Sequence, residues 1–105
     1  MNFETELENG NFIVAECKHC QKIVWPPSDF CNKCFGDVSW RKGSHEGKII
    51  EFSRKNDSYF CLIEIEKSIR LIGKLSRGIP IEGQQVKIEK CGIENKNYSF
   101  EISLL

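Results

Sequence analysis

Four cysteines in the first third of the chain constrain its fold more than any other feature. They form two pairs, Cys17-Lys-His-Cys20 and Cys31-Asn-Lys-Cys34, with ten residues between them. A Cys-x-x-Cys turn aims both sulfurs at one point, and two such turns supply the four ligands that Zn²⁺ accepts in tetrahedral geometry at ~2.3 Å. The spacing therefore predicts a metal site formed by Cys17, Cys20, Cys31 and Cys34.

Disulfide pairing is the main alternative use of clustered cysteines, and it requires an oxidising compartment. The N-terminal sequence MNFETELENG lacks the basic and then apolar pattern of a signal peptide. The chain also has no apolar run near the ~20 residues of a membrane helix. We therefore expect a cytoplasmic protein without a membrane segment. A thioredoxin-like redox pair would need a βαβ unit, which the sequence lacks.

The identity of the metal follows from the rest of the chain. Four thiolates hold iron as well as zinc, so a rubredoxin-like electron carrier is an alternative. Because no other feature suggests electron transfer, we expect structural zinc with no position open to water or substrate. Binding of the ion, worth on the order of 10 kcal/mol in small zinc modules, would fold this segment. We expect His19, inside the first pair, to face solvent.

Composition divides the chain into three segments. Residues 1–11 are acidic, and although Phe3 and Leu7 could share one helical turn, Asn9-Gly10 breaks it. We expect a flexible or partner-dependent N-terminus there. Residues 12–46 are rich in cysteine and turn formers but poor in aliphatic side chains, so we assign the four-cysteine zinc ribbon to them.

Residues 47–105 show the period-two alternation of half-buried strands. Gly73 is expected to mark a bulge or bend, and Gly78, Pro80 and Gly83 leave no place for a long helix between residues 76 and 84. Five short strands favour a small barrel of the OB type over a sandwich. The predicted fold is all-β, a zinc ribbon followed by a five-stranded OB barrel. The predicted strands are 48–53, 59–66, 69–75, 85–91 and 98–104.

Charge limits the classes of partner. Fifteen Lys and Arg residues balance 15 Asp and Glu residues, which excludes a histone-like binder that depends on a basic excess. Zinc ribbons and OB barrels do bind single-stranded nucleic acid, so this remains the alternative function. Arg70 and Lys74 belong to a modest basic patch, but the expected outward positions also carry carboxylates that repel phosphates. These carboxylates are Glu64, Glu66, Glu89 and Glu101.

The order of motifs resembles a known family. The two cysteine pairs enclose VWPP (24–27) and precede Gly36, VSW (38–40) and GKIIEFS (47–53). The second half continues with FCLIEIE (60–66), IRLIGKL (69–75) and IEGQQVKI (81–88). Over residues 12–104 this pattern is similar to the OB-fold proteins with a rubredoxin-like zinc ribbon that accompany acyl-CoA enzymes, the family named domain of unknown function thirty-five.

The resemblance implies an accessory, non-catalytic role. Family members pair with thiolases, with hydroxymethylglutaryl-CoA synthase, or with hydratases and aldolases acting on steroid side chains. Some also contribute to acyl-CoA binding, and the ribbon serves as a docking element. Aromatic residues near the ribbon could form such a docking patch or fill the ribbon core and its junction with the barrel. These residues are Trp25, Phe30, Phe35 and Trp40.

No catalytic residue is predicted. The sequence has no Ser/His/Asp or Cys/His arrangement with supporting context. Cys61 and Cys91 stand alone in apolar surroundings, and we expect both to be small core residues. No ligand-binding residue beyond the four cysteines is predicted.

Overall fold

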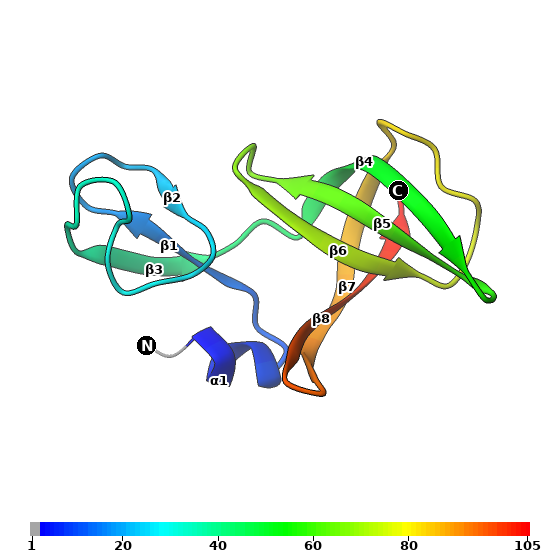
Figure 1. Cartoon of the computed structure of the whole chain (residues 1–105), viewed down its shortest axis with the longest axis horizontal. Coiled ribbons are helices and arrows are strands. Elements are labelled where there is room, and N and C mark those ends of the chain that lie inside the picture. Colours follow the sequence, from blue (N-terminus) through cyan, green and yellow to red (C-terminus); the bar gives the residue numbers. More distant parts are fainter. Residues whose placement is uncertain (1–2) are drawn as a thin grey trace.

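The computed structural model describes residues 3–105. The molecule is elongated, 42 × 27 × 19 Å, with a small sheet at one end and a barrel at the other (Figure 1). The small sheet has three strands, and the barrel is closed and has five. Apart from one helix of six residues, the elements of the described chain are strands. The predicted all-β class is confirmed.

β1 (Ile13–Cys17) is the central strand of the three-stranded sheet. It pairs antiparallel with β2 (Ile23–Val24) on one side and β3 (Val38–Lys42) on the other. A small cluster of Ala15, Cys17, Val24 and Cys31 is buried beneath this sheet. Two of these four side chains are thiols, so little hydrocarbon stabilises this part of the chain.

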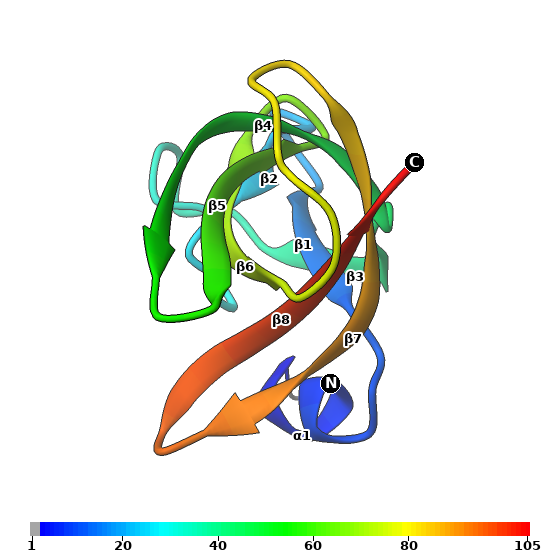
Figure 2. The same cartoon turned by 90° about the vertical axis from the view of Figure 1, so that its right-hand side faces the viewer.

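The barrel contains β4 (Glu46–Lys55), β5 (Ser58–Ile65), β6 (Ile69–Leu75), β7 (Gln85–Glu94) and β8 (Asn97–Leu104). Their order is β4-β5-β6-β8-β7, and β7 pairs back with β4 to close the barrel, seen nearly end-on in Figure 2. All neighbours are antiparallel except β6 and β8. Five strands in this closed Greek-key arrangement form the predicted OB barrel.

The barrel core follows the predicted alternation. Side chains on β5 and β6 alternate strictly between the interior and the outer face from Cys61 to Ile65 and from Ile69 to Leu75. Tyr98 shares a face of β8 with the buried Phe100 and Ile102 but remains 41% exposed, because it lies at the start of the strand, beyond the closed part of the barrel. Wholly buried side chains include Ile63, Ile65, Ile69 and Val86.

Gly73 does not form the expected bulge. It pairs with Cys61 in a regular register, and an added Cβ would lie 2.7 Å from Ile102 Cγ2. A close approach between β6 and the side chain of β8 therefore explains this glycine. The register shifts occur elsewhere, between Ile49 and Glu51 and between Ile88 and Lys90.

The described part of segment 1–11 differs from the expected flexible terminus, while residues 1 and 2 lie outside the described residues. α1 (Phe3–Glu8) buries Phe3 and Leu7 in the core cluster that includes the barrel. Their spacing of four places both side chains on one face of the helix. Gly10, at φ 83°, ends the helix, as the Asn9-Gly10 break predicted. No helix of the described residues is long and apolar enough to span a membrane.

A short connection joins the ribbon to the barrel. β4 begins at Glu46, and β3 ends at Lys42. However, Phe12, Ile13 and Val14 are buried in the same cluster as the barrel core. The division into independent units at 12–46 and 47–105 therefore stays a prediction.

Candidate metal centre

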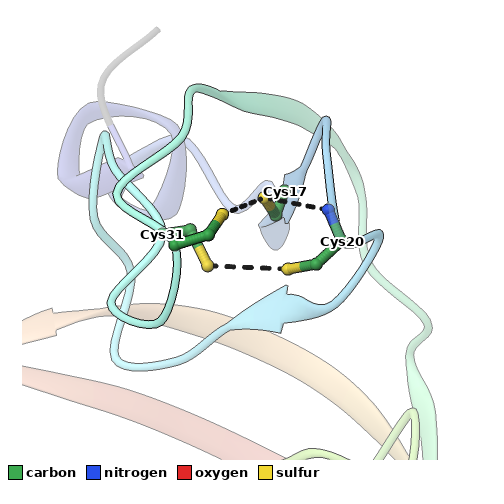
Figure 3. Close-up of side chains that lie close together, drawn as sticks. Cys17, Cys20 and Cys31 are labelled. Carbon is green, nitrogen blue, oxygen red and sulfur yellow. Dashed lines mark hydrogen bonds between the residues drawn. The ribbon is translucent and has the colours of Figure 1, made fainter.

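The four predicted ligands lie together at the end of the ribbon. Their sulfur atoms are all within 4.8 Å of one another, and Figure 3 shows Cys17, Cys20 and Cys31 with their sulfurs turned toward a common centre. The Sγ atoms of Cys17 and Cys34 are 3.4 Å apart, and those of Cys20 and Cys31 are 3.7 Å apart. Four sulfurs bound tetrahedrally at ~2.3 Å would be about 3.8 Å apart, so the arrangement fits Zn²⁺. These distances exceed the ~2.05 Å of a disulfide bond.

The two cysteine turns have the same local structure. In each turn, the residue after the second cysteine donates its N–H to the carbonyl oxygen of the first cysteine. Gln21 bonds Cys17 in this way at 3.0 Å, and Phe35 bonds Cys31 at 2.9 Å. Both donors adopt left-handed backbone angles, φ 58° and φ 60°. This conformation reverses the chain and places two sulfurs of each turn on the same side.

Backbone amides face the first cysteine of each turn. The Sγ of Cys17 accepts the N–H groups of Cys20 and His19, both at 3.4 Å. These hydrogen bonds, led by that from Cys20, outweigh the effect of burial and lower the pKa of Cys17 to about 6. The pKa of Cys31 is lowered in the same way, mainly by the N–H of Cys34. The buried first cysteines are therefore the thiols most readily ionised.

The second cysteines of the two turns, Cys20 and Cys34, are exposed, and their pKa values are raised. The N–H of Gly36 lowers the pKa of Cys34, but the hydrogen bond with Cys17 and burial raise it to about 11. The hydrogen bond from the N–H of Lys22 lowers the pKa of Cys20, but the hydrogen bonds with Cys17 and Cys31 and burial together have the larger effect and raise it. The thiols of Cys20 and Cys34 therefore keep their protons to a higher pH than those of Cys17 and Cys31. Metal ligation would displace the remaining protons, which makes affinity dependent on pH.

The other residues singled out in the sequence, His19 and the four aromatic residues, differ in how far they are buried. His19 is exposed, and its ring lies against Gly36, where an added Cβ would be 2.4 Å from His19 Cδ2. Trp25 and Trp40 are half-buried and pack against the core. Phe30 and Phe35 are 58% and 80% exposed. Of the four predicted aromatic residues, the tryptophans belong to the ribbon–barrel junction and the phenylalanines face solvent.

The contribution of Phe3 and Phe12 to the ribbon–barrel junction was not predicted from the sequence. The ring of Phe12 packs edge-on against Phe100 and Trp25, with ring centroids 5.8 Å and 6.3 Å apart. The ring of Phe3 packs against Trp25 with centroids 5.9 Å apart. The sequence feature that could have indicated this contact is the apolar run that begins at Phe12, directly before the cysteine pairs. This aromatic seam fixes the metal-binding end relative to the barrel.

An ion-pair network crosses the same junction. Arg41 on β3 contacts Glu16 on β1 at 3.2 Å and also Glu66 in the β5–β6 turn. Glu66 further accepts the N–H of Ser44 at 3.0 Å. Burial raises the pKa of Glu66, but the hydrogen bonds from Arg41 and Ser44 have the larger combined effect and lower it. The Glu66 carboxylate thus holds the ribbon, the connecting segment and the barrel together.

Comparison with known proteins supports the ribbon assignment. Residues 5–40 match the family described as the rubredoxin-like zinc ribbon domain of ChsH2. The resemblance is confirmed. A four-cysteine cluster within a domain of this kind points to a bound metal ion.

The whole fold is similar to solved structures. One is a chain named "Ltp2-ChsH2(DUF35) aldolase", with a TM-score of 0.70 and 15% identity over 94% of this chain and 90% of that one. Another is a protein of unknown function from the DUF35 family of Sulfolobus solfataricus, with a TM-score of 0.68 and 17% identity over 96% of this chain and 82% of that one. At these identities the similarity is one of fold.

Proposed function

We propose that the chain is a non-catalytic accessory subunit of an acyl-CoA-handling enzyme complex, of the thiolase or hydroxymethylglutaryl-CoA synthase type. The observation that carries this proposal is the combination of two similarities. The ribbon matches the ChsH2 family, and 94% of the chain matches the fold of a ChsH2(DUF35) chain whose name includes an aldolase. A small chain with this architecture is suited to binding a larger enzyme.

The proposed role of the metal is structural. Cys17, Cys20, Cys31 and Cys34 would hold one Zn²⁺, and four thiolates fill a tetrahedral coordination shell. With its positions filled, the ion would shape the ribbon. The ribbon would then present its surface to the partner enzyme.

The remaining thiols favour a non-catalytic role. Cys61 has no exposed surface, and burial raises its pKa. Burial also raises the pKa of the half-buried Cys91. A thiol nucleophile reacts as the thiolate, so both environments disfavour it.

Phe30 and Phe35 are the proposed docking residues. Both lie on the loop that carries the second cysteine pair, and both rings are more than half exposed. Large aromatic side chains are enriched at the centres of protein interfaces because they bury a large area at low entropic cost. We assign the partner contact to this loop.

We give nucleic acid less weight as a ligand. On the outer face of the barrel, Arg70 is paired with Glu64 at 3.4 Å. Lys74 is paired in register with Glu101 on β8. The carboxylates beside both cations weaken attraction to a phosphate backbone.

Purification of the tagged chain from its native host tests the proposal. We expect an acyl-CoA enzyme to co-purify in fixed stoichiometry and to be identified by mass spectrometry. Replacing Phe30 and Phe35 by serine should reduce its recovery by roughly tenfold or more, as expected for interface aromatics. Ile79→Ser with Ile81→Ser is the matched control, because these barrel-loop side chains are 72% and 64% exposed.

Two outcomes would contradict the accessory role. One is a monomer that co-purifies with no acyl-CoA enzyme. The other is a chain that binds single-stranded oligonucleotides at physiological salt. Equal loss of the enzyme in both double variants would reject the assignment to Phe30 and Phe35 while leaving the accessory role intact.

A further inference from the structure

A cleft of about 520 Å³ lies where α1, the ribbon and the start of β8 meet. Figure 1 shows α1 below β3 and beside the turn that leads into β8. The helix contributes Phe3 and Glu4 to the cleft, and the loop before the second cysteine pair contributes Asp29. Trp40 on β3 and Tyr98 on β8 line the same space. The volume lies within the range of small-molecule sites, roughly 300–1,000 Å³.

Three aromatic rings form one wall of the cleft. The ring of Phe3 packs edge-on against Tyr98 with centroids 5.2 Å apart, and its centroid lies 6.4 Å from that of Trp40. Phe3 is buried and supports the other two rings, whereas Trp40 is half-buried and Tyr98 is exposed. The face of an aromatic ring carries partial negative charge. The accessible surfaces of Trp40 and Tyr98 therefore suit a positively charged ligand.

The ionisable groups of the lining are negative or neutral. Over residues 3–105, they are the carboxylates of Glu4 and Asp29 and the phenol of Tyr98, with no lysine, arginine or histidine. Asp29 makes no ion pair within this range. Burial and the charge of Glu4 raise the pKa of Tyr98, so its ring stays uncharged near neutral pH. The four thiolates of the ribbon would keep a net negative charge around a divalent ion, so they do not offset the two carboxylates.

Local structure positions the groups that line the cleft. Trp40 is paired with Ala15 of the central ribbon strand β1. The N–H of Phe30 donates to Ser28 Oγ at 3.3 Å, in a turn that has Asp29 at its centre. The mutual packing of the three rings sets the orientation of the other side of the cleft. The site is therefore formed by the fold before any ligand binds.

We propose that this cleft binds a small organic cation of the substituted-ammonium class. The methyl or methylene groups beside its nitrogen lie against the rings of Trp40 and Tyr98, an arrangement by which proteins recognise quaternary ammonium ligands. The carboxylates of Glu4 and Asp29 supply the opposite charge. This site goes beyond the accessory role, which assigns no ligand to this cleft.

The lining favours an organic cation over a bare metal ion. Ca²⁺ takes roughly six to eight oxygen ligands, whereas the cleft offers two carboxylates from separate elements. Among the described residues, the group that comes close enough to hold a metal ion is the four cysteines, outside this cleft. A weakly hydrated ammonium group with apolar substituents instead gains energy from contact with aromatic rings.

Titration of the full metal-loaded chain with choline, followed by amide and indole NMR, tests the site. We expect shifts confined to residues 3–4, 27–29, 40 and 98 and their direct neighbours. Neohexyl alcohol is the uncharged analogue in which carbon replaces the ammonium nitrogen. It should bind roughly tenfold more weakly, because it keeps the shape of choline without the charge that the rings and carboxylates attract. Sodium chloride at equal concentration is the control for ionic strength.

A charge variant tests the two carboxylates. Glu4→Gln with Asp29→Asn keeps the side-chain shapes and should weaken choline binding by about threefold to tenfold, while neohexyl alcohol binding stays within about twofold. Glu51→Gln with Asp57→Asn is the matched control, because it removes the same charge from exposed positions on β4 and in the β4–β5 turn. This control should leave choline binding within about twofold.

A ring variant tests the aromatic wall separately. Tyr98→Leu removes the aromatic face at an exposed position and should weaken choline binding by about threefold or more. Tyr98→Phe keeps the ring and should stay within about twofold. Preserved amide dispersion of β7 and β8 shows that both variants fold.

Four results would overturn the site. The first is an absence of shifts beyond those that sodium chloride produces, and the second is equal affinity for choline and neohexyl alcohol. The third is equal weakening of choline binding in the two charge variants. The fourth is a Tyr98→Leu chain that binds choline as tightly as the Tyr98→Phe chain. Recovery of the partner enzyme is scored separately, so either proposal can fail alone.

Discussion

The ribbon and the barrel are stabilised by different means. The buried cluster of the ribbon consists of Ala15, Val24 and two cysteines. The barrel instead buries long aliphatic side chains, such as Ile63 and Ile69, with no exposed surface. Hydrophobic burial can account for the second region but not for the first. We therefore infer that metal ligation supplies in the ribbon the stabilising free energy that hydrophobic burial supplies in the barrel.

The ribbon also depends on the barrel for part of its order. Phe12 precedes the cysteine pairs in sequence, yet it is 1% exposed and packs against Phe100 of the barrel. The first residues of β1 are thus anchored by the barrel, while its last residue, Cys17, belongs to the metal centre. β1 should therefore remain partly ordered when the metal is removed.

Removing the metal should have the largest effect. A chelator that removes the ion withdraws on the order of 10 kcal/mol of binding free energy from the ribbon. We expect amide NMR signals of residues 17–40 to collapse toward unfolded values, while β5 and β6 keep their dispersion. Cys31→Ser should reproduce this result, and Cys91→Ala, outside the cluster, should not. A ribbon that keeps its dispersed signals with no metal would show that metal ligation is not what stabilises it.

A cavity in the barrel core should destabilise the barrel and leave the metal site intact. Ile63 is wholly buried, and Ile63→Ala should lower the free energy of unfolding by about 2 to 5 kcal/mol. Because the metal centre lies outside the barrel, zinc affinity measured by chelator competition should stay within roughly threefold of the original chain. A parallel loss of zinc affinity would show that the two regions form one cooperative unit.

A methyl group added to β4 should destabilise the barrel through a clash with β5. In Gly47→Ala the new Cβ would lie 2.6 Å from the carbonyl oxygen of Glu64, an atom of the β5 backbone that cannot move freely. We expect a loss of about 1 to 3 kcal/mol in chemical denaturation. Gly92→Ala is the matched control, because its Cβ would have no neighbour within 4 Å. Equal stability of the two variants would contradict the tight β4–β5 contact.

Loss of the Glu66 carboxylate at the ribbon–barrel junction should have the smallest effect on stability. The pKa of Glu66 is lowered below its ordinary value of 4.5, so its carboxylate stabilises the fold above pH 4.5. That contribution is lost as the pH falls through the lowered pKa. Glu66→Gln should therefore cost about 1 kcal/mol at neutral pH and flatten the stability profile below pH 4.5. Glu51→Gln, at an exposed position of β4, is the control. An unchanged profile would show that the network with Arg41 contributes nothing measurable.

Periodicity in the sequence predicted most of the barrel. Alternation from 59 to 66 and from 69 to 75 placed the buried faces of β5 and β6 correctly, since each residue of a strand points opposite to its neighbour. It failed at Gly73, because a glycine required by a contact with another strand has the same local pattern as one in a bulge. The geometry of the metal cluster was predictable, because its spacing is local.

Contacts between distant segments were not predictable. α1 is ordered because Phe3 and Leu7 find apolar partners on elements far along the chain, and Asn9-Gly10 indicated only where the helix ends. The link from Arg41 to Glu66 likewise depends on how the ribbon sits on the barrel. Charged residues on turns carry no periodicity that reveals such partners.

Native mass spectrometry of the chain purified without added metal shows whether the four cysteines bind an ion. We expect one zinc ion per chain, bound with loss of protons from the thiols, and no bound metal after Cys31→Ser. Two results would contradict a metal site at these cysteines. One is a mass lower than that of the reduced, metal-free chain by the hydrogens lost in forming two disulfides, and the other is a reduced chain that carries no ion.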